Sequence, residues 1–112
     1  MVVVLPHALE DFHYGDFTRV GIEPSASYAI LAIAYLVQLS GIALLAAGRN
    51  VGGLVVGLTG LVWLTGDAAL HGHDFLFAGA AYRHGFVSRL LEGLIFVLGA
   101  ACAAVGWRVW RS

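Results

Sequence analysis

The longest uncharged stretch of this chain is residues 24–48, which read PSASYAILAIAYLVQLSGIALLAAG. Two further stretches without a charged residue cover 50–66 and 93–107. A helix of about 20 apolar residues crosses the roughly 30 Å hydrocarbon layer of a bilayer. The apolar runs are continuous rather than alternating, which favours helices over barrel strands. We therefore predict an all-α integral membrane fold with transmembrane helices at about 28–47, 51–71 and 88–109.

The composition excludes several classes of protein. Of the 112 residues, 60% are hydrophobic and only 12% are charged, whereas soluble domains carry about 25% charged residues. A chain this short cannot bury so much apolar surface as a soluble monomer. It has six arginines and no lysine, so no basic stripe for a nucleic acid is present. We expect one polytopic membrane domain, 1–112, whose surroundings are the lipid bilayer.

The charges differ between the two ends of the predicted bundle. Three spans place the N-terminus and the 72–87 loop on one side, with all seven acids and three arginines. The opposite side holds three arginines and no acid, and such a side is the better cytoplasmic candidate. We predict a multi-pass protein of the cell membrane, with the N-terminus outside and the C-terminus in the cytoplasm. The apolar stretch 75–82 could enter the bilayer as a half-helix.

The segment before the first span, residues 1–26, is expected to lie outside the membrane. Pro6 is a favourable first residue for a short helix over 6–14. On such a helix one side is apolar, and the other carries His7, Glu10 and Asp11. This pattern is typical of an interfacial helix whose polar side is solvated.

Each predicted span has a face of small residues, which allow helix backbones to approach closely in lipid. Each of these faces also carries polar groups, so the acids are expected to point into the bundle or an oligomer interface. The chain is accordingly expected to form a homo-oligomer or to join partner membrane subunits. The packing residues are Gly53, Gly57 and Gly60 in the second span, Gly99, Ala103 and Gly106 in the third, and, with Gln38, a weaker face in the first.

The histidines and acids near the predicted helix ends form a candidate metal site. Intramembrane acids are costly unless they are paired, neutral or metal-bound, and mixed nitrogen and oxygen ligands suit copper, zinc or iron. The predicted ligands are Asp67, His71, Asp74, His84 and Glu92. Residues that could support or replace them are His7, Glu10, Asp11, His13, His73 and Arg89.

Two metal-free alternatives stay open for these residues. Arg89 could pair with Asp67 or Glu92 as a structural lock, and Asp74 could cap a short helix in the 75–82 segment. Haem is not expected, because His71 and His84 would lie at helix ends rather than within the membrane.

The pattern Asp67-x3-His71-x12-His84 resembles the copper-ligand set found in a membrane component of the particulate methane and ammonia monooxygenases. The resemblance covers about 18 residues and implies copper as one candidate metal. The Arg-Asp-Thr and Pro-Ser-His surroundings of that family are absent, since this chain reads Gly72-His73-Asp74 and Tyr82-Arg83-His84. The family itself is therefore not assigned.

Three functions are compatible with this sequence. The first is a small membrane metalloprotein with an outward-facing site at the helix ends, either redox-active or accessory to a membrane oxidoreductase. The second is a non-catalytic structural subunit of a larger, respiratory-type complex. The third is an oligomeric proton or cation transporter that uses the intramembrane acids. Whether the protein is an enzyme is left open. The chain has no GxGxxG, P-loop, HExxH or CxxC motif, so the patterns do not favour nucleotide binding or zincin chemistry.

Overall fold

Three long helices dominate the structure, a computed structural model that describes residues 2–78 and 85–112. These residues are helical throughout apart from short connections and contain no strand. The helices in chain order are α1 (Val4–Tyr14), α2 (Asp16–Arg19), α3 (Pro24–Ala46), α4 (Val51–Phe77) and α5 (Gly85–Arg111).

Helices α3, α4 and α5 are long and apolar enough to span a membrane, with 23, 27 and 27 residues. At a rise of 1.5 Å per residue, the two longer helices extend about 40 Å, which exceeds the hydrocarbon thickness. The three predicted helices are thus confirmed. Helix α3 begins four residues earlier than expected because Pro24 occupies its first turn, where proline needs no hydrogen-bond partner for its nitrogen.

The second predicted span is too short, because α4 continues past His71 to Phe77. The glycine at position 72 does not end it, and its last turns pack against the start of α5. There Phe75 meets the ring of Phe96 edge to face, with centroids 5.0 Å apart. Residues 72–77 are therefore a continuation of α4 and not part of a separate half-helix. The rest of that predicted half-helix falls largely on 79–84, outside the described residues.

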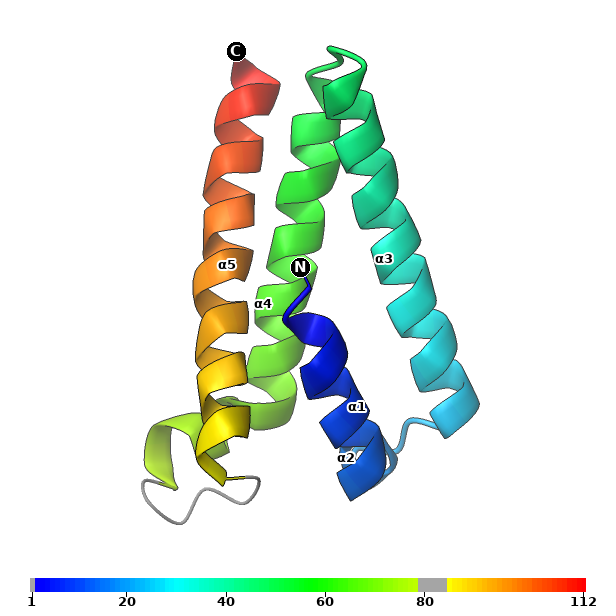
Figure 1. Ribbon diagram of the computed structural model, residues 1–112, viewed down its shortest axis with the longest axis vertical. Helices are drawn as coiled ribbons and strands as arrows, with labels where there is room; N and C mark the ends of the chain where they lie inside the picture. Colours follow the sequence, from blue (N-terminus) through cyan, green and yellow to red (C-terminus); the bar gives the residue numbers. More distant parts are fainter. Residues whose placement is uncertain (1, 79–84) are drawn as a thin grey trace.

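The long helices are arranged unevenly (Figure 1). Helices α4 and α5 run antiparallel and side by side over their whole length. Helix α3 meets α4 at the end that carries the 47–50 turn and diverges from it toward the other end. Helices α1 and α2 occupy the side on which α3 diverges, and α1 starts about halfway along the bundle. This arrangement places the N-terminal helix against the lower half of α4 and α5.

Close backbone contact holds α4 against α5. A Cβ atom added at Gly53 would lie 2.7 Å from the carbonyl oxygen of Gly106, and one at Gly60 equally close to that of Gly99. Any side chain at these positions would push the helices apart, so glycine sets their separation. The structure thus brings together the two small-residue faces of the sequence, which contain Gly53, Gly57 and Gly60 on α4 and Gly99, Ala103 and Gly106 on α5.

A polar contact joins α3 to α4 in the middle of the bundle. The indole Nε1 of Trp63 donates a hydrogen bond to Oε1 of Gln38 at 3.3 Å, and both side chains are buried. The polar residue on the first predicted packing face therefore does point inward, where it provides an acceptor that the buried indole needs.

Helix α1 has the opposite orientation from the one expected. Its buried residues include His7 and Asp11, which are 2% and 3% exposed, whereas Leu5 and Leu9 are 49% and 58% exposed. The prediction of a solvated polar side is therefore wrong for His7 and Asp11. The physical reason is that the polar side of α1 finds partners on α4 and α5. Leu5 and Leu9 are left facing outward, while Val4 and Ala8 are buried beside the polar groups.

Candidate metal centre

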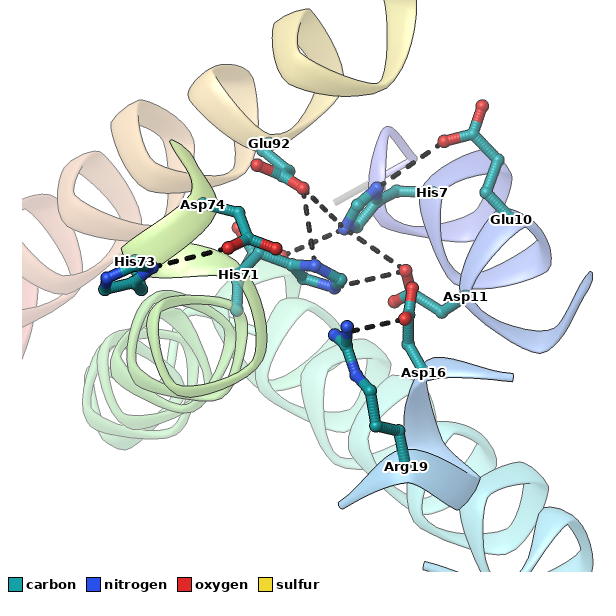
Figure 2. A network of polar contacts seen from close by, with 10 residues as sticks. His7, Glu10, Asp11, Asp16, Arg19, His71, His73, Asp74 and Glu92 are labelled. Atoms are coloured by element: carbon teal, nitrogen blue, oxygen red, sulfur yellow. Dashed lines mark hydrogen bonds and ion pairs between the residues drawn. The ribbon is translucent and has the colours of Figure 1, made fainter. Parts of the chain in front are cut away.

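Five ionisable side chains from three helices converge in one cluster, and Figure 2 labels four of them. Helix α1 brings two of them, because residues four apart lie on the same face of a helix. Helix α4 brings two more at the same spacing, and α5 brings one. Their exposed fractions range from 0% to 8%. The members of this cluster are His7, Asp11, Asp67, His71 and Glu92.

The two imidazoles direct their Nε2 atoms toward one shared carboxylate, that of Asp11. Nε2 of His7 lies 3.1 Å from Oδ1 of Asp67 and 3.7 Å from Oδ1 of Asp11. Nε2 of His71 lies 3.1 Å from that same oxygen of Asp11. Ligand atoms around a tetrahedral zinc ion, with bonds of about 2.1 Å, are about 3.4 Å apart. The spacing of His7, Asp11 and His71 is therefore close to that of a metal-ligand set, and their ligand atoms all lie within 4.8 Å of one another.

The opposite nitrogen of each imidazole faces a glutamate. Nδ1 of His71 lies 3.5 Å from Oε1 of Glu92, and Nδ1 of His7 lies 3.8 Å from Oε2 of Glu10. Metal-binding histidines commonly use their second nitrogen in this way, because the carboxylate fixes the tautomer and strengthens the ligand. Both contacts are longer than a good hydrogen bond, so the two glutamates lie behind the imidazoles and would support His7 and His71 after a small approach to the rings.

The cluster carries an excess of negative charge. Asp11, Asp67 and Glu92 place three carboxyl groups around two imidazoles, enclosed where water has little access. Oδ2 of Asp67 and both carboxylate oxygens of Glu92 are buried without a hydrogen-bond partner among the described residues. Buried charge of this kind is costly unless it is compensated. A divalent cation is one group that would compensate it.

The imidazole of His7 responds to this negative surrounding. Burial by itself would lower the pKa of His7. The hydrogen bond with Asp67 and the charges of Asp11, Asp67 and Glu92 outweigh that effect and hold the pKa of His7 above its ordinary value of 6.5. The site thus attracts positive charge at this nitrogen, either as a proton or as a metal ion.

Some predicted ligands lie elsewhere. Asp74 pairs with His73 at 3.4 Å on the surface of α4, where the His73 side chain is 85% exposed, and the exposed His13 packs on Tyr14. Asp74 does not cap a separate helix, because it lies inside α4. The predicted ligand His84 falls outside the described residues.

The alternative of an arginine lock does not describe the contacts seen at the two acids. Arg89 donates a hydrogen bond to the carbonyl oxygen of Phe75 at 2.9 Å and lies over its ring. The ion pairs described for Asp67 and Glu92 are with His7 and His71 instead.

The site also lies further inside helix α4 than the sequence indicates. Because α4 ends at Phe77, His71 lies nearly two turns and Asp67 nearly three turns inside the helix. The expectation of a site at the helix ends is corrected accordingly. From the sequence, His7 and Asp11 are expected only as supporting residues, although their i, i+4 spacing matches that of Asp67 and His71 and is the signal that could have found them.

The chain was compared with known protein families, curated proteins and solved structures, and none of them matched.

Proposed function

We propose that this protein is a small integral membrane metalloprotein that holds one divalent transition-metal ion among α1, α4 and α5. The ligands are His7, Asp11 and His71, with Asp67 as a fourth, and Glu92 and Glu10 support the two imidazoles. The observation that carries this proposal is the buried His7–Asp11–His71 group, whose ligand atoms lie within 4.8 Å of one another. The shared oxygen of Asp11 lies between both imidazole nitrogens.

The donor set narrows the candidate metals. Two imidazoles with one or two carboxylates suit zinc, iron(II) or copper(II), and no thiolate is available, because Cys102 lies on the upper half of α5. Two histidines with a carboxylate and a free coordination position are the arrangement used by non-haem iron enzymes. A bound ion would offset the negative charge of the cluster and supply Lewis-acid or redox chemistry at that position.

The direct test is the metal content of protein purified without a chelator. We expect one transition-metal ion per chain in the wild type and a large loss in His71→Ala. The matched control is His73→Ala, which removes a histidine two positions away that is exposed and paired only at the surface. A wild type without metal, or equal metal in His71→Ala and His73→Ala, would refute the proposal.

Transport of protons or cations is a weaker candidate for a single chain. Above the cluster, the buried polar side chains among the described residues are Gln38 and Thr59. Gln38 accepts a hydrogen bond from Trp63, and Thr59 donates to the backbone of its own helix. The tight glycine contact between α4 and α5 fills the remaining space. The polar residues therefore form an enclosed site rather than a continuous path.

We keep the predicted orientation as part of this proposal, with the cluster in the half of the membrane nearer the outside. Arg108 and Arg111 support it, because they lie in the last turn of α5 at the opposite end of the bundle. Labelling of single cysteines from each side of intact cells tests the orientation.

Assembly with a second copy or with partner subunits, including a structural role in a larger complex, also remains a prediction.

A further inference from the structure

A cavity of about 140 Å³ lies directly beside the cluster of ionisable side chains, between α1, α3 and α4. Most of its wall is apolar and comes from residues such as Leu31, Ala34, Trp63 and Ile95. Three members of the cluster, His7, Asp11 and Asp67, form the rest of that wall. The cavity therefore joins an apolar chamber to the metal ligands.

The volume sets the size of an occupant. An engineered apolar cavity of about 150 Å³ stays dry and binds benzene or xenon. The present cavity is nearly as large and equally suited to one aromatic ring or an aliphatic group of similar size. A longer molecule would have to extend out through the opening.

The rim of the cavity lies on the outer side of the bundle. Ile30 on α3 and Val62 on α4 line it and are 57% and 54% exposed. Gly66 also lines it, and a Cβ atom added there would meet nothing within 4 Å. In the proposed membrane arrangement this opening faces the hydrocarbon of the bilayer, so an apolar molecule would enter from the lipid.

The polar atoms on the wall fix how a molecule would be oriented. Oγ of Ser27 already donates to the carbonyl oxygen of Glu23, and Nε1 of Trp63 donates to Gln38. Oδ2 of Asp67, by contrast, is buried without a hydrogen-bond partner among the described residues. The polar end of an occupant would thus meet its partners at the cluster and not elsewhere on the wall.

We propose that the cavity between α1, α3 and α4 binds a ring-sized, uncharged, mainly apolar molecule from the bilayer, with one hydroxyl group directed at the cluster. This inference rests on the proposed function, because the ligands of the metal form the polar part of the wall. An anionic molecule is disfavoured because the three carboxyl groups of the cluster exceed the charge of one divalent ion, and a strongly polar one is disfavoured by the apolar walls.

The test measures binding of three small probes to the purified protein by fluorine NMR. The probes are fluorobenzene, para-fluorophenol and para-fluorobenzoate. We expect para-fluorophenol to bind about tenfold more tightly than fluorobenzene, which is the effect of one hydrogen bond to a charged group. We expect no binding of para-fluorobenzoate at the cavity.

Variants distinguish binding of the probe in the cavity from its partition into detergent and from the effects of misfolding. Ala34→Phe fills the cavity and should weaken binding of para-fluorophenol about tenfold or more. Gly66→Leu fills the cavity from its rim and replaces Ala34→Phe in the test if Ala34→Phe fails to fold. The matched control is Ala32→Phe, on the exposed side of the same helix, which should bind the probe like the wild type.

Metal content is measured in the same samples, so that the two proposals can fail separately. Equal probe binding in the wild type and Ala34→Phe, or preferred binding of para-fluorobenzoate, would overturn the cavity proposal even in fully metal-loaded protein. Probe binding that Ala34→Phe abolishes in protein that takes up no metal would support the cavity and refute the metal site.

Discussion

Replacing Asp11 by asparagine should remove most of the stabilisation that the proposed metal ion would confer. Its Oδ1 atom lies 3.1 Å from Nε2 of His71 and 3.7 Å from Nε2 of His7, so it is the oxygen that both imidazoles share. A unit charge about 4 Å from another contributes about 4 kcal/mol at an effective dielectric constant of 20. Because the amide oxygen of asparagine can still bind weakly, we take a loss of about 100-fold in metal affinity, or about 2.7 kcal/mol.

This loss has a measurable consequence for thermal stability. A metal at 100 times its Kd stabilises the wild type by about 2.7 kcal/mol, and the same concentration would stabilise Asp11→Asn by only about 0.4 kcal/mol. For a domain of this size, about 4 °C of Tm corresponds to 1 kcal/mol. The metal-dependent rise in Tm should therefore fall from about 10 °C to below about 2 °C.

The assay is thermal unfolding in detergent, followed by tryptophan fluorescence, with and without added metal. Trp63 lies beside the cluster in the cavity wall and reports on this region. The control is Asp74→Asn, an acid on α4 that pairs with a surface histidine, and it should keep the full rise in Tm. The reasoning is refuted if Asp11→Asn shows the same metal-dependent rise as the wild type.

Three further predictions concern other parts of the structure. Glu92→Gln should weaken metal binding about 10- to 100-fold, because it removes the carboxylate behind the imidazole of His71. Glu10→Gln should have a smaller effect, because Glu10 is partly exposed. Titration calorimetry measures both affinities. Metal affinity should decrease as the pH is lowered, because protons compete with the metal for His7. The decrease should begin at a higher pH than for an ordinary imidazole, since the pKa of His7 is raised. Titrations over a pH series check this, and a constant affinity would contradict it. Gly60→Val should lower the free energy of unfolding by about 1–3 kcal/mol by overpacking against α5. Gly66→Ala meets no neighbour and alanine favours a helix more than glycine, so this control should not lower the free energy of unfolding in a denaturant titration.

The three long helices could be predicted because the signal for them is local. An uncharged apolar run longer than the bilayer is thick specifies a helix, whichever partner it packs against. The end of α4 could not be predicted in this way. Gly72 and the polar His73 and Asp74 resemble a boundary, and the contacts of Phe75 with Phe96 and Arg89 on α5 make the additional turns favourable.

The site was predictable only in part, for a different physical reason. The spacing of Asp67 and His71 places both on one helix face, and Glu92 lies on the small-residue face of α5, so the sequence alone places these groups inward. The orientation of α1 depends on groups 60 or more residues away in the chain. An amphipathic helix is expected to bury its apolar side. Helix α1 buries His7 and Asp11 instead, because ionisable side chains on α4 and α5 form ion pairs with them.

Because α1 buries His7 and Asp11, a metal ion bound at the proposed site would be part of what holds the N-terminal helix in place. Leu5 and Leu9 face outward, so the apolar contacts of α1 come from Val4, Ala8 and Phe12, whose ring stacks on Tyr28. The contacts that remain are those of His7 and Asp11 with Asp67 and His71. Without a cation, three carboxylates repel one another across the same junction. Because α1 also forms one wall of the cavity, occupancy of the metal site and of the cavity should be coupled, and each would strengthen the other by the same factor.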